Sequence, residues 1–193
     1  MKIYDIRIND EDETGVQLVS FVKSPAMEVE AIKLSKEPML FAKDEYKQYL
    51  TSAVIIPDKL IPRMNGNEMY MIRFSSDTIE KIRNKFHTQT GNLKLSNFDH
   101  NSEYTVSATL IESWIKTSEN DKSVALGFDL PVGSWLSTYH VSDTQFWNEK
   151  ILTNEVTGFS LEGVFETIET KLPKDEEPTL DQLMDDLLAD ILK

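Results

Sequence analysis

Short runs of strand-forming residues, separated by turn residues, recur along the first 170 positions. These runs cover residues 2–8, 16–22, 46–56, 68–74, 104–116, 124–130 and 156–170. Apolar and polar side chains alternate in several of them, which is typical of strands with one buried face. The first two runs flank an acidic turn that ends at Gly15, a pattern that predicts a hairpin. The chain is therefore expected to form an α+β domain that is mostly β.

Two segments break this strand pattern and are expected to be helices. The polar stretch S-S-D-T can cap a helix over residues 78–86, where Ile79, Ile82 and Phe86 form one stripe. A second, short helix is expected over residues 142–151. Both helices would flank the strands.

The C-terminal residues differ in composition from the rest. Residues 171–178 form a charged linker bounded by prolines, so residues 1–170 are expected to be one domain. In residues 179–193, apolar side chains recur at alternating steps of three and one, and four aspartates occupy the other positions. This spacing predicts an acidic amphipathic helix. It could dock to a partner protein, or pack on the domain or on a second copy.

Charge and composition exclude several functions. The 20 basic and 33 acidic residues give a net charge of −13, which argues against general binding of nucleic acids or anionic membranes. The absence of cysteine excludes disulfides, zinc–thiolate sites and cysteine catalysis. The N-terminus lacks the apolar core of a signal peptide, and no apolar run approaches a membrane span, so we expect an intracellular protein.

The stretch G-F-S-L-E-G places Ser160 between two glycines and resembles the G-x-S-x-G nucleophile elbow, with the second glycine one residue late. All three histidines precede Ser160, so the residue order of an α/β-hydrolase is excluded. Gly158 and Gly163 are expected to leave backbone open to a substrate chain and to an oxyanion. The alternative is an ordinary strand serine.

Three histidines compete for the role of a base. His100 lies in the polar segment F-D-H-N and is the best candidate for accepting a serine proton. His87 is expected at the C-terminal end of a helix, where a cation is favourable. His140 follows aromatic residues and is expected to pack there. The sequence has no H-x-x-x-H, H-E-x-x-H or calcium-loop pattern, so neither a metal site nor a cofactor is expected, and a metal-dependent hydrolase has little support.

A third residue would orient His100. Glu112 is favoured because its neighbours are apolar, which suggests partial burial. Asp99, Glu162 and Glu166 are alternatives, and the residues alone do not choose between them.

Six motifs together resemble one protein family. They are I-I-P-D-K-L-I-P-R (55–63), M-Y-M-I-R-F-S-S-D-T-I (69–79), D-H-N (99–101), E-S-W-I (112–115), D-K-S-V-A-L-G-F-D-L-P-V-G-S-W (121–135) and G-F-S-L-E-G-V-F (158–165). The chain is similar to the XkdF-like serine proteases of phages and prophages, relatives of the prohead proteases. The resemblance implies an assemblin-like fold, a closed or partly closed β-barrel flanked by a few helices. It also implies that Ser160 and His100 are catalytic, with Glu112 as the proposed third residue.

The resemblance also implies a function and partners. Such a protease cleaves scaffold or capsid-protein segments, and sometimes itself, inside the assembling procapsid in the host cytoplasm. Its expected partners are phage capsid and scaffold proteins and further copies of the chain, such as a dimer, with no nucleic acid and no membrane. The N-terminal L-V-S-F-V-K-S-P-A resembles a strand that follows the serine strand in many prohead proteases, which suggests a circular permutation. In that strand Leu18 stands where relatives carry an acid, so a catalytically inactive structural or scaffolding protein is the alternative.

Overall fold

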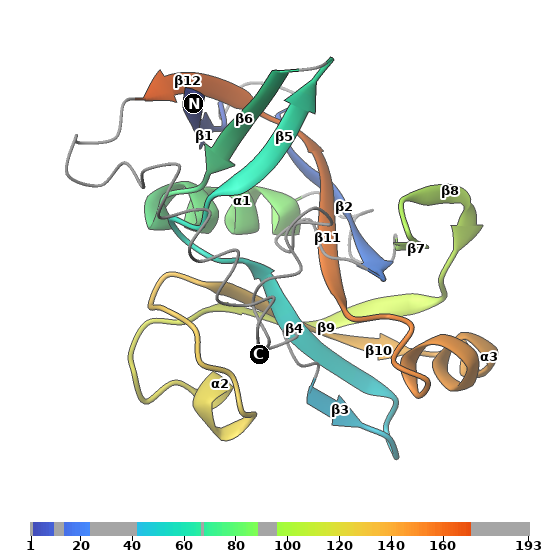
Figure 1. Cartoon of the computed structure of the whole chain (residues 1–193). Helices are drawn as coiled ribbons and strands as arrows, with labels where there is room; N and C mark the ends of the chain where they lie inside the picture. Colours follow the sequence, from blue (N-terminus) through green and yellow to red (C-terminus); the bar gives the residue numbers. More distant parts are fainter. Residues whose placement is uncertain (1, 10–13, 24–41, 67, 89–95, 171–193) are drawn as a thin grey trace, which may run out of the picture.

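The computed structural model describes residues 2–9, 14–23, 42–66, 68–88 and 96–170. The expected helix over residues 179–193 and the linker before it lie outside these ranges. The described part is mostly β, with twelve strands and a few short helices (Figure 1).

The twelve strands form three sheets of four strands each. One sheet has the order β12 (Glu166–Thr170), β1 (Lys2–Arg7), β6 (Glu68–Arg73), β5 (Ile61–Asn65). The next has the order β3 (Ala42–Asp44), β4 (Tyr49–Ile55), β10 (Trp135–Val141), β9 (Ala108–Ile115). The last has the order β11 (Gly158–Val164), β2 (Gly15–Val22), β7 (Asn97–Phe98), β8 (Asn101–Thr105).

Two expectations about strand pairing are wrong. Each described sheet is open, so the strands do not close into the expected barrel. The first two strands do not form a hairpin either, because β1 pairs with β12 and β6, whereas β2 pairs with β11 and β7. The expected long strand over residues 156–170 is divided at Phe165 into β11 and β12, which join different sheets. Local alternation predicts strands but cannot choose their partners.

Helix α1 (Ser76–Thr88) confirms the first expected helix and buries Ile79, Ile82 and Phe86. Helix α3 (Thr144–Phe146) and the π-helical turn η2 (Trp147–Ile151) confirm the second. The strand expected over residues 124–130 is wrong, because helix α2 (Lys122–Ala125) begins there. Asp121 caps α2 by accepting a hydrogen bond from the Ser123 amide, and Gly127 follows with φ 90°. This cap and the left-handed residue favour a helical turn over an extended chain.

An aromatic cluster holds the third sheet against the second. The Phe159 ring packs edge-to-face on Phe21 and Tyr139, with ring centroids 5.3 Å apart in both pairs. Phe21 also packs on Phe146 of α3 at 5.8 Å. These side chains are buried, so they hold β2 and β11 firmly through their inner face. The outer face of the same two strands carries the candidate site. Within the described ranges, no helix is long and apolar enough to span a membrane.

Candidate active site

Strands β2 and β11 bring two serines and a glutamate onto one face. The strands are antiparallel, with Ser160 opposite Ser20 and Glu162 opposite Leu18. Since Phe159 and Phe21 point into the core, Ser160 and Ser20 point the other way. Opposite residues on one face of a sheet have Cβ atoms roughly 4.5–5.5 Å apart, so the two hydroxyls are neighbours.

His100 reaches this face from the turn between β7 and β8. Phe98 pairs with Asn101, which leaves Asp99 and His100 as a two-residue connection. Both have positive φ, 57° and 59°, which is the conformation of a type I′ hairpin turn. The Asp99 amide also donates to the Phe21 carbonyl oxygen at 2.9 Å, which ties the turn to β2. Aspartate and histidine adopt this conformation more readily than most non-glycine residues.

The Glu162 carboxylate holds the centre of the site. Its Oε1 accepts hydrogen bonds from the Ser20 hydroxyl at 2.7 Å and the Asn97 amide at 2.8 Å, and lies 3.0 Å from His100 Nδ1. Burial raises the pKa of Glu162, but the hydrogen bonds from Ser20, Asn97 and His100 outweigh burial and hold its pKa below the usual value. The group is therefore a carboxylate at neutral pH.

An ionised carboxylate can only accept, so the proton of a neutral His100 ring stays on Nδ1. The Ser20 oxygen, 3.3 Å from Nδ1, lies beside the same contact. The other nitrogen, Nε2, is then unprotonated and can take a proton, the arrangement that a general base needs. The His100 side chain is 42% exposed, so a substrate can approach it.

Ser160 itself is only 2% exposed, and its hydroxyl has no hydrogen-bond partner among the described residues. It lies opposite Ser20 in the strand register, and the Ser20 hydroxyl is the one that contacts both Glu162 and His100. Ser160 and Glu162 on β11 and the turn that carries His100 thus belong to one sheet, whereas no hydrogen bond among the described residues joins the Ser160 hydroxyl to His100. Their catalytic roles remain a prediction.

The structure gives a reason for glycine at position 163 that the sequence did not reveal. A Cβ atom there would meet the Gly15 carbonyl oxygen at 2.2 Å, because the strand register shifts between Glu162 and Gly163. The late glycine therefore allows β2 to approach closely at a bulge. The sequence predicted that Gly163 leaves backbone open to a substrate. This prediction is wrong for the side of Gly163 that faces Gly15.

The other candidate residues lie apart from this cluster. Glu112 is on β9, in a different sheet, where it bonds Lys122 at 3.0 Å and Thr138 at 3.3 Å. His87 ends α1, and burial lowers its pKa first, with Arg83 lowering it further. His140 packs edge-to-face on Tyr49. These contacts give Glu112 no link to His100.

The remaining acids also have other neighbours. The Asp99 carboxylate lies 3.4 Å from the Lys23 amide, and Glu166 is exposed on β12 opposite Arg7. No three histidine, aspartate or glutamate side chains of the described ranges gather closely enough to hold a metal ion.

Ser20 and Asn97 are members of the cluster that sequence reasoning missed. The signal was present in part, because Ser20 stands in L-V-S-F-V, one of the stretches that resemble prohead proteases. Asn97 precedes D-H-N in the same polar segment. Only the pairing of β2 with both β11 and β7 shows that they share one carboxylate.

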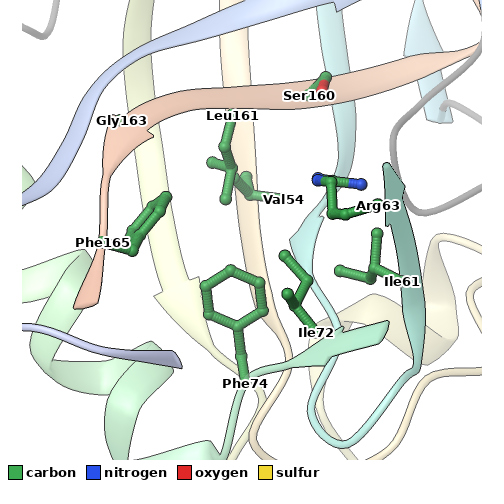
Figure 2. A pocket seen from close by; sticks show the side chains of 9 residues that line it. All are labelled: Val54, Ile61, Arg63, Ile72, Phe74, Ser160, Leu161, Gly163 and Phe165. Carbon is green, nitrogen blue, oxygen red and sulfur yellow. The ribbon is translucent and has the colours of Figure 1, made fainter. Parts of the chain in front are cut away.

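A pocket opens on the other side of β11. Its lining residues come from β4, β5, β6 and β11 and from the residues that directly follow β6 and β11, and Leu161 points into it while Ser160 lies at its edge (Figure 2). The pocket has a volume of about 220 Å³ and is mostly apolar, with Arg63 as its charged residue.

The protein is therefore β-rich, and one of its sheets carries serines, a histidine and a glutamate. Residues 37–169 match the model of the family described as "Putative phage serine protease XkdF". The chain belongs to this family, which confirms the resemblance seen in its motifs. No curated protein and no solved structure is significantly similar to the chain.

Proposed function

We propose that the protein is a head-maturation endopeptidase of a phage or prophage, which cleaves scaffold or capsid-protein segments during procapsid assembly. The observation that carries the proposal is the 3.0 Å contact between His100 Nδ1 and Glu162 Oε1. It leaves Nε2 free to act as a base, and the proposal requires this nitrogen to reach the Ser160 hydroxyl. Membership of a phage serine protease family supports the reaction class.

In the proposed mechanism, Ser160 Oγ attacks the carbonyl carbon of a peptide bond and His100 Nε2 takes its proton. The tetrahedral intermediate collapses, and the same proton goes to the leaving amine as the C–N bond breaks. Water then attacks the acyl-enzyme, again with His100 as base, and releases Ser160. Glu162 holds the ring orientation and stabilises the imidazolium that forms in each step.

We assign the orienting role to Glu162 rather than Glu112. Glu162 contacts the ring, whereas Glu112 is occupied by Lys122 and Thr138. The assignment also bears on Leu18, which stands where the resemblance to prohead proteases implies an acid. Because Leu18 lies directly opposite Glu162, the carboxylate that β2 lacks is supplied from the facing strand.

The test is co-expression with the cognate capsid and scaffold proteins, followed by mass analysis of the products. Wild type is expected to give shortened products, whereas Ser160→Ala and His100→Ala leave the partners intact. Ser137→Ala, a buried strand serine of the second sheet, is the matched control and should cleave as wild type does. Intact products with wild type would sink the protease proposal.

The second candidate is a protease-fold structural protein of the phage head. It is favoured by the burial of Ser160, whose hydroxyl a substrate carbonyl cannot reach until side chains move. In that case wild type and Ser160→Ala would both support assembly of heads with uncleaved components. This second function would be supported if deletion of the whole protein disrupts head assembly while Ser160→Ala gives normal heads.

A further inference from the structure

The pocket beside β11 has the size and lining of a site for apolar side chains. Its apolar wall is built from three sheets of the fold: Val54, Ile61, Ile72, Phe74, Leu161 and Phe165. Its volume of about 220 Å³ is below the roughly 300–1,000 Å³ of pockets that enclose a whole small molecule. It therefore suits one or two side chains of a polypeptide that continues outside.

Arg63 gives the pocket a charge. Its Nη1 donates to the Pro62 carbonyl oxygen at 2.9 Å, and among the described residues no carboxylate forms an ion pair with Arg63. Burial lowers the pKa of Arg63, partly offset by Tyr70, so the cation is poorly solvated. A cation in apolar surroundings is stabilised by an anionic partner. Figure 2 shows Arg63 among the apolar side chains of the pocket. The fitting ligand thus combines an apolar side chain with a nearby carboxylate.

The C-terminal segment of this same chain has that chemistry. Residues 179–193 carry an apolar stripe with aspartates at 181, 185, 186 and 190. Residue pairs across the first sheet show that Thr170, the last described residue, lies near the pocket. Thr170 pairs with Ile3, Ile3 with Met71, and Met71 with Pro62, the residue before Arg63.

Three strand spacings of about 4.8 Å separate the two ends of this row, or about 14 Å. The eight linker residues 171–178 span up to about 26 Å when extended. Residue 179 can therefore reach the pocket, and the covalent link gives the segment an effective concentration of about 1 mM there. A separate peptide would have to compete with it.

We propose that residues 179–193 dock over this pocket, with apolar side chains of the stripe inserted and an aspartate beside Arg63. The pocket adjoins Ser160 on β11, so the docked segment occupies the neighbourhood of the candidate nucleophile. This docking does not depend on the proposed protease activity.

The cysteine-free chain allows a clean crosslinking test in full-length Ser160→Ala protein. Leu161→Cys is combined in turn with Leu183→Cys, Met184→Cys or Leu187→Cys on the stripe, and with Gln182→Cys on the polar side as matched control. Disulfide formation under mild oxidation is followed by non-reducing gel and intact mass. Phe165→Cys replaces Leu161→Cys as anchor if that variant does not fold. At least one stripe position should form an intramolecular disulfide roughly tenfold faster than Gln182→Cys.

A charge reversal tests the role of Arg63. Arg63→Glu should slow the selected crosslink roughly tenfold, and Asp185→Lys with Asp186→Lys should restore it. Arg7→Glu, on β1 and outside the pocket, should leave the rate unchanged. Equal rates at all tail positions, or disulfides only between two copies, would overturn the docking. If a crosslink is selective but its rate does not change in Arg63→Glu, the proposed contact between Arg63 and an aspartate is wrong.

Discussion

Two pairs of buried serines face each other across antiparallel strands, one in each of two sheets. Ser20 lies opposite Ser160 on β2 and β11, and Ser52 lies opposite Ser137 on β4 and β10. All four are at most 2% exposed. The hydroxyls of Ser52, Ser137 and Ser160 share a further property, since none has a hydrogen-bond partner among the described residues.

The difference between the pairs is in their neighbours. The Ser20 hydroxyl donates to Glu162 and lies 3.3 Å from His100. In the described part of the chain, no histidine or carboxylate bonds Ser52 or Ser137. Burial and a missing partner therefore do not identify a nucleophile. What distinguishes Ser160 is that the serine opposite it, Ser20, contacts an oriented imidazole.

The largest expected effect is the difference in cleavage rate between substitutions of two serines that lack hydrogen-bond partners among the described residues, Ser160 and Ser137. Ser160→Ala should lower the cleavage rate at least about 10³-fold, because the covalent step is lost. Ser137→Ala should stay within about twofold, since it removes a buried hydroxyl that bonds nothing. Rates are measured on the cognate scaffold or capsid protein. Equal losses in both variants would show that the comparison reflects packing alone.

The two strand glutamates form the next comparison. Glu162→Gln keeps the shape but loses the charge that fixes the His100 tautomer, so the rate should fall about 10²- to 10⁴-fold. Glu112→Gln should change it about twofold at most, because its partners are Lys122 and Thr138. Cleavage rates measured at saturating substrate check both. A larger loss in Glu112→Gln would return the orienting role to that residue.

Ser20→Ala tests whether Ser20 acts as a positioning residue for Glu162. Removing one of the donors to Glu162 should lower the rate roughly tenfold, equivalent to a loss of about 1.4 kcal/mol. It should also raise the pKa of Glu162, because one hydrogen bond to the carboxylate is lost, and an NMR titration of the carboxyl group measures this change. Ser52→Ala is the matched control and should leave the pKa of Glu162 in place. A Glu162 titration in Ser20→Ala that overlays wild type would contradict the positioning role.

The smallest expected effect is on stability. The pKa of Glu162 is lower in the folded protein than the usual 4.5, so its contribution is fully present above that pH. This contribution is lost as the pH falls through the lowered folded value. The free energy of unfolding of wild type should therefore exceed that of Glu162→Gln more at pH 7 than at pH 3, by about 0.5–1 kcal/mol after discounting for exposure. Urea titrations at both pH values measure this difference, and Ser137→Ala should show none.

Strand existence was largely predictable because alternation and turn residues are local properties. The strands over residues 2–8 and 68–74 became β1 and β6 almost unchanged, and the stripe of Ile79, Ile82 and Phe86 predicted α1 correctly. The barrel and the first hairpin were wrong because pairing depends on distant strands. The segment 124–130 was wrong because the Asp121 cap outweighs strand propensity there.

The sequence by itself determined the family and the strand-rich composition, and it predicted Ser160 and His100 as site residues. Each of these follows from the type and order of residues along the chain. Only the tertiary structure decided which acid stands at His100. Glu112 and Glu162 are both strand glutamates in similar surroundings, and strand order puts Glu162, rather than Glu112, on the sheet that contains the turn of His100.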